Sequence, residues 1–234
     1  MTWRSLIFFS LGALAAAAPV TGRVELRDSR DAAVRKGLDY SGVVVWLEPV
    51  RAVAATRPAL KARIVQRDKT FSPHVLAIQT GTRVDFPNFD PIFHNAFSNY
   101  NGQLFDVGLY PPGTSRSVRF GRAGVVRVFC NIHPNMSAVI VALETPYFAV
   151  TQKDGTYRIE NVPPGEYRLR VFHERATDAV LNGLAKTVTV GAEPLVAAPL
   201  SISESGYLAV PHTNKFGHEY HTPAHESGLY PAAR

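Results

Sequence analysis

The strongest constraint on this chain is a short stretch between two apolar runs, Val128-Phe-Cys-Asn-Ile-His-Pro-Asn-Met136. The runs on either side, 125–129 and 138–142, are rich in β-branched residues and predict two strands. Pro134 and the asparagines beside it predict a tight turn between them. The stretch is therefore expected to form the loop of a hairpin, which brings its side chains close to one point.

The side chains in this loop are of types that bind metal ions. Cys130, His133 and Met136 have the spacing Cys-x2-His-x2-Met, and the chain contains one Cys and two Met, of which one is the initiator. A thiolate, imidazoles and a weak axial thioether are the ligands of a copper electron-transfer site. The fourth ligand must come from elsewhere, and His94 is the best candidate. A single Cys is more often a buried apolar residue than a ligand, but the spacing favours a metal site.

The N-terminus predicts export. Residues 1–18 combine a short basic start, an apolar core and small residues before a cleavage site, which is the pattern of a secretory signal peptide. A retained membrane anchor is the alternative, although the apolar run is short for a span. We expect a periplasmic protein without stable membrane insertion after signal removal. In an oxidising compartment a single thiol is exposed to oxidation unless it is buried or bound to metal.

Charge and motifs narrow the function classes. The formal net charge is +6, but the basic residues are scattered, and no dense cluster of them predicts nucleic-acid binding. Arg116, Arg119 and Arg122 are candidates for steering an acidic redox partner. No nucleophile–base pattern, nucleotide-binding loop or carboxylate motif predicts an enzyme.

The remaining pattern predicts an all-β fold, because short apolar or alternating runs follow one another and no long helical period precedes residue 143. Residues 27–41 and 49–60 are expected to be loops, and one helical turn is the alternative for part of the second. The predicted strands are 21–26, 42–48, 62–66, 74–78, 83–86, 117–120, 125–129 and 138–142, followed by 148–151, 156–160, 166–173, 186–190 and 195–202.

Residues 60–143 resemble a cupredoxin, the copper-binding Greek-key β-sandwich of plastocyanin and amicyanin. The resemblance rests on Val84-Asp-Phe-Pro-Asn-Phe-Asp90, His94-Asn95, Phe105-Asp-Val-Gly-Leu-Tyr110, Gly113 and the loop 128–136. It implies one type 1 copper ion.

The resemblance also implies roles for individual residues. The strong ligands would be His94, Cys130 and His133, and Met136 would be the axial ligand. Asn95 would form a hydrogen bond across to the cysteine loop and hold it in place. The electron would leave through the exposed edge of His133.

The later part of the chain predicts a second unit. The run Asp154-Gly-Thr-Tyr-Arg-Ile-Glu-Asn-Val-Pro-Pro-Gly-Glu-Tyr167 resembles the carboxypeptidase regulatory-like module, a small non-catalytic β-sandwich. The whole chain resembles exported plastocyanin-like proteins that are often labelled methylamine utilisation proteins, a label that establishes no role here. The predicted division is therefore a signal peptide at 1–18, a copper domain at 19–144, a β-sandwich at 145–203 and a tail at 204–234.

Half of the chain's eight histidines lie in the tail, at His212, His218, His221 and His225. Histidine-rich tracts can bind metal, so a second, weaker metal site is one interpretation. A loosely ordered or docked segment is the other. Of the remaining histidines, His173 is expected to be structural rather than a ligand, and His74 has no predicted partner.

These observations predict a periplasmic one-electron carrier that cycles between Cu(I) and Cu(II) and exchanges electrons with a redox protein. The alternative is a copper-binding or copper-delivery protein that uses the same site together with the histidine-rich tail. A third interpretation is an adhesion or scaffold protein in which the β-domains bind a partner.

Overall fold

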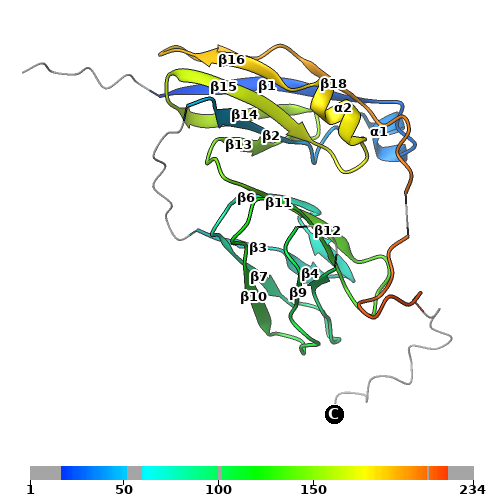
Figure 1. Cartoon of the computed structure of the whole chain (residues 1–234). Helices are drawn as coiled ribbons and strands as arrows, with labels where there is room; N and C mark the ends of the chain where they lie inside the picture. The colour runs from blue at the N-terminus through cyan, green and yellow to red at the C-terminus, as the bar shows by residue number, and fades with distance from the viewer. Residues whose placement is uncertain (1–16, 52–59, 100–101, 210, 221–234) are drawn as a thin grey trace, which may run out of the picture.

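The computed structural model describes residues 17–51, 60–99, 102–209 and 211–220 (Figure 1). The predicted all-β class is confirmed. The elements are β1 (Ala18–Arg27), α1 (Ala32–Gly37), β2 (Val44–Pro49), β3 (Lys61–Arg63), β4 (Val65–Arg67), β5 (Thr70–Ser72), β6 (Val75–Gln79), β7 (Arg83–Pro87), β8 (Phe97–Ser98), β9 (Phe105–Asp106), β10 (Ser115–Arg119), β11 (Gly124–Phe129), β12 (Ser137–Leu143), β13 (Phe148–Val150), β14 (Thr156–Val162), β15 (Gly165–Phe172), α2 (Asp178–Gly183), β16 (Lys186–Val190), β17 (Leu195–Val196) and β18 (Leu200–Ser203).

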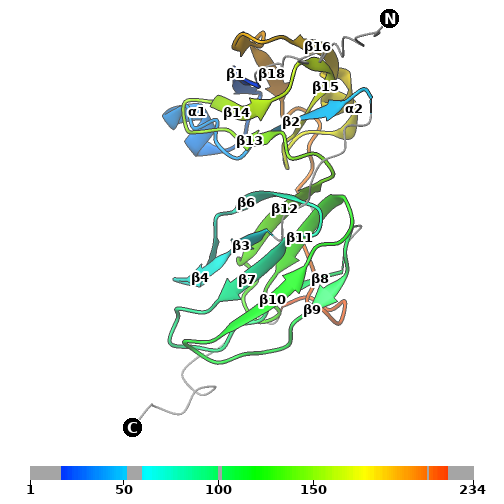
Figure 2. The ribbon, with the colours of Figure 1, turned by 90° about the vertical axis from the view of Figure 1, so that its left-hand side faces the viewer.

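The strands form two β-sandwiches, one above the other in Figures 1 and 2. The upper sandwich packs the sheet β14-β1-β17, with β18 also paired to β1, against the sheet β13-β2-β15-β16. The lower sandwich packs β10-β7-β3 against β6-β12-β11-β8-β9, and β4-β5 forms a small hairpin beside them. Each sandwich has its own apolar core.

The strand pairing divides the chain differently from the predicted ranges 19–144 and 145–203. β1 pairs with β14 through Val20 and Ile159, and β2 pairs with β15 through Leu47 and Leu169. The two N-terminal strands therefore belong to the upper sandwich, in which each has a neighbour on both sides. Their buried apolar faces are completed only by strands from the far end of the sequence, a long-range pairing that local pattern cannot reveal.

The start of β1 also bears on the predicted signal peptide. Residues 1–16 of the predicted segment lie outside the described residues. Ala18, however, is the first residue of β1, is 1% exposed and pairs with Val162. The predicted range 1–18 thus overlaps β1 by one residue. No helix among the described residues is long and apolar enough to cross a membrane.

Two short helices occupy segments for which no helix was predicted. α1 lies within the expected loop 27–41 and is capped by Asp31, whose side chain accepts a hydrogen bond of 2.8 Å from the amide of Ala33. α2 is capped by Thr177, whose hydroxyl accepts a hydrogen bond from the amide of Val180. Side-chain caps of this kind stabilise a helix too short to show a clear period. The predicted loop 49–60 falls mainly on residues 52–59, which lie outside the described part.

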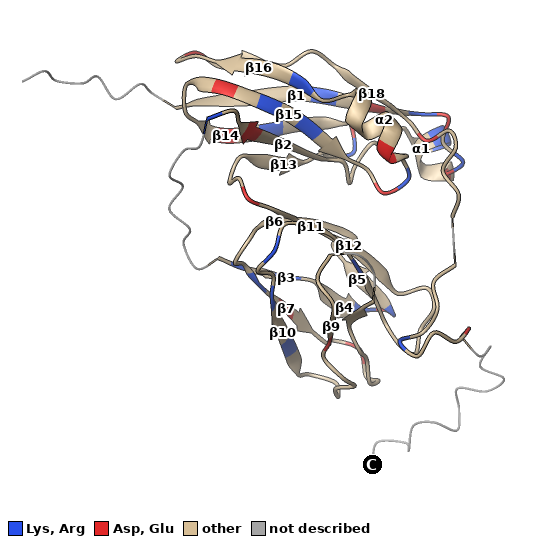
Figure 3. Ribbon diagram, viewed as in Figure 1, with Lys and Arg blue, Asp and Glu red and all other residues tan. Residues whose placement is uncertain are grey.

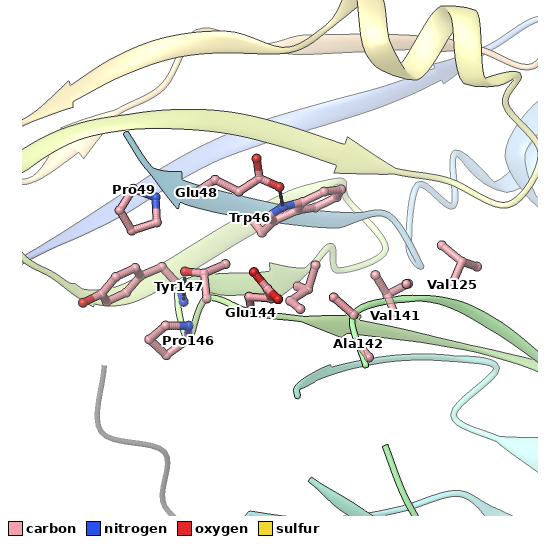
Figure 4. Close-up of a pocket in the computed structure, with 13 residues that line it drawn as sticks. Trp46, Glu48, Pro49, Val125, Val141, Ala142, Glu144, Pro146 and Tyr147 are labelled. Carbon is pink, nitrogen blue, oxygen red and sulfur yellow. Dashed lines mark hydrogen bonds between the residues drawn. The ribbon is translucent and has the colours of Figure 1, made fainter. Parts of the chain in front are cut away.

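A third apolar cluster joins the two sandwiches. It contains Val44 from the upper sandwich and Val75, Val139, Val141 and Leu143 from β6 and β12 of the lower one. At one end of this contact lies a cleft of about 760 Å³ between β2 and the segment after β12 (Figure 4). Its lining includes Trp46, Glu144 and Tyr147. The cleft is at the far end of β12 from Met136, about 20 Å away at the usual rise of a strand.

Candidate metal centre

The loop between β11 and β12 presents its three predicted ligands from a closed turn. Cys130 directly follows β11, and Met136 directly precedes β12. The amide of Cys130 donates to the carbonyl of Met136 (3.2 Å), and the amide of Met136 donates to the carbonyl of His133 (3.1 Å). The hairpin predicted from the sequence is therefore present, and its register holds the loop at the end of the sandwich.

His94 reaches the same place from the segment between β7 and β8. Its backbone pairs with Tyr110, whose amide donates to the His94 carbonyl (2.9 Å) and whose carbonyl accepts from the His94 amide (3.2 Å). Tyr110 is fully buried, accepts a hydrogen bond from Gln66, and donates through its hydroxyl to the carbonyl of Phe86 (2.9 Å). The backbone on both sides of His94 is thus anchored in the lower core.

The structure brings His94, Cys130 and His133 together, with one potential ligand atom from each lying within 4.8 Å of the others. The Cys130 Sγ lies 3.7 Å from Nδ1 of His133 and 4.0 Å from Nδ1 of His94. The two imidazole rings meet edge to face, with centroids 4.9 Å apart. The exposed fractions are 0% for His94 and Cys130 and 8% for His133.

These separations fit a metal ion. Bonds of about 2.0 Å to imidazole nitrogen and about 2.3 Å to thiolate sulfur, at the angles of a trigonal plane, would separate sulfur from nitrogen by about 3.7 Å. Both imidazoles turn Nδ1 toward the sulfur. Met136 is fully buried in the same apolar cluster as Cys130. The donor set contains the thiolate, imidazole and thioether types that copper sites use.

The surroundings of Cys130 also suit a thiolate bound to a cation. Burial raises the pKa of the thiol, while hydrogen bonds from the backbone amides of Ile132, Asn95 and His133 act in the opposite direction. Amides aimed at a sulfur atom stabilise its ionised form. A buried thiolate requires a positive charge nearby, and a bound metal ion would supply it.

Asp90 is a residue of this site that the sequence analysis missed. Its Oδ2 accepts a hydrogen bond of 2.7 Å from Nε2 of His94, which leaves Nδ1 of the same ring directed at Cys130. Burial alone would raise the pKa of Asp90, but hydrogen bonds from the Lys69 amide, His94 and the Asp68 amide lower it. A carboxylate in this position fixes the tautomer and the orientation of a metal-binding histidine. The available signal was a carboxylate four residues before the candidate ligand.

Asn95 forms the predicted hydrogen bond to the cysteine loop through its backbone and not through its side chain. Its side-chain nitrogen donates to Oδ1 of Asp106 (2.8 Å) and to the carbonyl of Gly108 (2.9 Å), not to the cysteine loop. The backbone amide of Asn95 is the group that bonds toward Cys130. An ionised carboxylate is a stronger acceptor than a backbone carbonyl, so the side chain of Asn95 donates to Asp106 and not to a carbonyl of the cysteine loop. Asn95 still connects the two segments, through its main chain.

The tail histidines do not form a metal group in the part of the chain that the structure describes. His212 contacts the cysteine loop, where its Nε2 donates to the carbonyl of Pro134 (2.7 Å). His218 is exposed, and His221 and His225 lie outside the described residues.

The two remaining histidines named in the sequence analysis have carboxylate partners. Nε2 of His173 lies 2.9 Å from Glu204, inside the upper sandwich. Nε2 of His74 lies 2.8 Å from Glu174 and Nδ1 lies 3.0 Å from the carbonyl of Ser137. His173 is therefore structural, as predicted, and His74 joins the two sandwiches.

No family model matches the chain, and no curated protein matches it. Among solved structures, the copper-containing nitrite reductase from Thermus scotoductus SA-01 is similar over 42% of this chain, with 27% identity and a TM-score of 0.36. This chain spans only 26% of that reductase. A purple cupredoxin from Nitrosopumilus maritimus is similar over 35% of this chain and 98% of its own length, with 28% identity and a TM-score of 0.32. Amicyanin from Paracoccus versutus is similar over 42% of this chain and 96% of its own length, with 18% identity and a TM-score of 0.33.

With a His-Cys-His group at the end of two packed sheets, the lower sandwich is cupredoxin-like. These comparisons do not support the predicted resemblance of residues 145–203 to a carboxypeptidase regulatory-like module.

Proposed function

We propose that this protein is a type 1 copper protein that carries one electron at a time. The observation that carries the proposal is the convergence of His94 Nδ1, Cys130 Sγ and His133 Nδ1 beside the buried Met136. The two imidazoles and the thiolate would hold the ion, and the thioether would be its weak axial ligand. Copper bound in this way supplies a reversible one-electron step.

The protein's contribution is rigidity. Asp90 fixes one imidazole, the turn between Cys130 and Met136 fixes the loop, and the fully buried Tyr110 anchors the segment that carries His94. Ligands held in this way cannot rearrange freely when the charge of the ion changes. A small rearrangement means a small barrier to electron transfer, which suits a carrier.

Burial of the ligands favours a carrier over a copper-delivery protein. Delivery requires that ligands from an acceptor reach the metal, but His94 and Cys130 are fully buried and His133 is 8% exposed. In addition, both ring nitrogens of His212 already lie near other groups, Nε2 at the carbonyl of Pro134 and Nδ1 at the hydroxyl of Tyr220. Retention of copper during redox cycling is therefore the expected behaviour.

The proposal includes export to the periplasm, which the N-terminal sequence pattern supports, and exchange of electrons with a redox protein. A surface for brief docking is provided by exposed apolar side chains in the segments that contain His94 and Tyr110, namely Phe89, Phe93 and Leu109. Weak redox encounters use small interfaces of this kind. Arg116 adds positive charge near this surface, because its guanidinium lies over the ring of Tyr110 at 5.8 Å.

The test is the visible spectrum of the oxidised protein loaded with copper. We expect an intense charge-transfer band from the Cys130 thiolate, and we expect Cys130→Ser to abolish it, because a hydroxyl is a hard and poorly ionised replacement. Met136→Leu is expected to keep the band and raise the reduction potential, since a donor to Cu(II) is lost. His218→Asn is the control and should change neither property. A Cys130→Ser protein with an unchanged band would refute the proposed site.

A further inference from the structure

The segment Pro211–Tyr220, here called the C-terminal strap, lies against the loop that carries Cys130. It follows the upper sandwich in sequence and descends to the ligand end of the lower one (Figure 1). The Tyr220 hydroxyl donates to the carbonyl of Cys130 (2.8 Å), and Nε2 of His212 donates to the carbonyl of Pro134 (2.7 Å). The amide of Lys215 donates to the side chain of Asn131 (3.0 Å). The strap thus binds the cysteine loop at three points.

The strap also reaches the segment that carries His94. Nζ of Lys215 donates to Oδ2 of Asp106 (2.8 Å), and Oδ1 of the same carboxylate accepts from the side chain of Asn95 (2.8 Å). Asn95 directly follows His94 in the chain. One carboxylate therefore joins the strap to the second half of the candidate metal centre.

The strap has an ordered internal structure. The Asn214 side chain accepts from the amides of Phe216 (2.9 Å) and His218 (3.1 Å), and its backbone pairs with the carbonyl of His218 (2.9 Å). Gly217 has a φ of 79°, which few residues other than glycine adopt without strain. This turn directs Lys215 to the sandwich, so the contacts come from a defined conformation.

Aromatic packing adds to the attachment. The His212 ring stacks on Phe129 at the end of β11, with ring centroids 3.9 Å apart and planes inclined by 23°. The Tyr220 ring packs edge to face against the His212 ring, with centroids 5.1 Å apart. The contact with Cys130 and the contact with Pro134 are therefore supported by one group of aromatic rings.

We propose that the C-terminal strap is a positioning element of the metal centre. The hydrogen bond to the carbonyl of Cys130 fixes the peptide group between Cys130 and Asn131. The orientation of the Cys130 thiolate and of the amide that follows it depends on this peptide group. The link from Lys215 through Asp106 to Asn95 ties this loop to the His94 segment. Copper would bind directly to none of the strap residues. The inference rests on the proposed function for its copper readout, and on the fold alone for its second readout.

The second readout uses metal-free protein. Cys130 is the only thiol in the chain, so its reaction rate with a thiol reagent reports how often the loop opens. The full-length variant His212→Asn/Lys215→Gln/Tyr220→Phe should react faster. Each lost hydrogen bond changes an equilibrium by about fivefold, so Tyr220→Phe alone should accelerate labelling about fivefold and the triple variant on the order of a hundredfold. The controls Tyr207→Phe and His218→Asn should react at the wild-type rate.

The copper readout separates this inference from the proposed function. If wild-type protein shows the charge-transfer band, the triple variant should show a shifted band and lose copper to a chelator about tenfold more readily. Wild-type protein without a band would refute the proposed function, while labelling would still test the strap. Wild-type labelling rates in the triple variant, or equal acceleration by His212→Asn and His218→Asn, would overturn the inference.

Discussion

The contact between His74 and Glu174 should make the stability of this protein depend on pH. His74 lies in the turn before β6 of the lower sandwich, and Glu174 follows β15 of the upper one. Nε2 of His74 lies 2.8 and 3.0 Å from the two carboxylate oxygens, and Nδ1 lies 3.0 Å from the carbonyl of Ser137. Both neighbours of the ring are acceptors, so only the protonated imidazole can donate to both. The replacement Glu174→Gln removes the charge that holds this proton.

The size of the effect follows from the exposure of the pair. Hydrogen bonds to charged groups contribute about 1.5–3 kcal/mol when buried, and exposed ion pairs contribute about 0–1 kcal/mol. The His74 side chain is 47% exposed, and that of Glu174 is 16% exposed. We therefore expect Glu174→Gln to lower the free energy of unfolding by about 1 kcal/mol, which is about 2–4 °C in Tm for a chain of this size.

The direction of the pH dependence follows from the two pKa shifts. The hydrogen bond to Glu174 raises the pKa of His74 above 6.5, with burial and Arg175 opposing it. The stability that this shift contributes is fully present below the unfolded-state pKa of His74 and is lost as the pH rises through its folded-state pKa. Burial would raise the pKa of Glu174, but His74 and Arg175 lower it below 4.5. Its contribution is present above 4.5 and is lost as the pH falls through the folded-state value.

Urea unfolding of wild type and Glu174→Gln should therefore differ most at about pH 5.5, and the difference should shrink toward about pH 8.5. Glu166→Gln, an exposed carboxylate on β15, is the matched control and should show no such trend. Metal-free protein should be used, so that copper binding does not add a second linkage. A difference of the same size at both pH values would show that the ion pair is not its source.

Two further predictions concern the metal centre and its surface. Asp90→Asn should weaken copper binding about tenfold and raise the reduction potential, because the hydrogen bond that makes the His94 ring a better donor is weakened; chelator competition and voltammetry measure both, and unchanged values would mean that Asp90 has no role in orienting the ligand. Basic residues lie on β10 (Figure 3). On this strand Arg116 pairs with Phe86, whereas Arg122 directly precedes Ala123, which lines the inter-sandwich cleft. Arg116→Gln should slow electron exchange with an acidic partner at low salt, more than Arg122→Gln does, and the difference should vanish at high salt; equal rates at low salt would exclude Arg116 from steering.

The part of the metal centre that sequence predicts is the part built from local geometry. Cys130, His133 and Met136 lie in one loop between adjacent antiparallel strands, so their convergence follows from spacing and turn residues. His94 lies far from this loop in the sequence, and its approach to the other ligands depends on how the loops cluster at one end of the sandwich, which is a property of the architecture. Most of the longer strands were predicted to within a few residues, but the short strands β5, β8 and β9 were not predicted, and the predicted strands 62–66 and 195–202 are each two strands.

Long-range contacts account for what sequence did not predict. Asp90 became part of the site because the hairpin β4-β5 holds its carboxylate with two amides, and that hairpin meets it only in the folded chain. The tail was interpreted as a second metal site or as a loose or docked segment, and its specific contacts with Cys130 and Asp106 depend on where the upper sandwich ends. The same reasoning applies to β1 and β2, whose partners lie more than a hundred residues away.

The sequence of β12, a strand of the lower sandwich, did indicate that a second sandwich packs against it. β12 reads Ser-Ala-Val-Ile-Val-Ala-Leu, and every residue after Ser137 is buried. A strand with water on one side alternates apolar and polar residues, whereas a strand buried on both sides is apolar throughout. Its two faces indeed enter different cores. Ala138, Ile140 and Ala142 pack inside the lower sandwich, and Val139, Val141 and Leu143 pack against the upper one.

This arrangement ties the metal loop to both sandwiches. Met136 lies next to the first residue of β12, so the strand that ends the ligand loop is held from two sides. Burial of each large aliphatic side chain on the outer face contributes about 2 kcal/mol. Without the upper sandwich, the lower sandwich would expose these side chains to water. The C-terminal strap would also lose the domain to which it is connected in the chain. The upper sandwich therefore acts on the candidate metal centre through β12 and the strap, although it contributes no ligand.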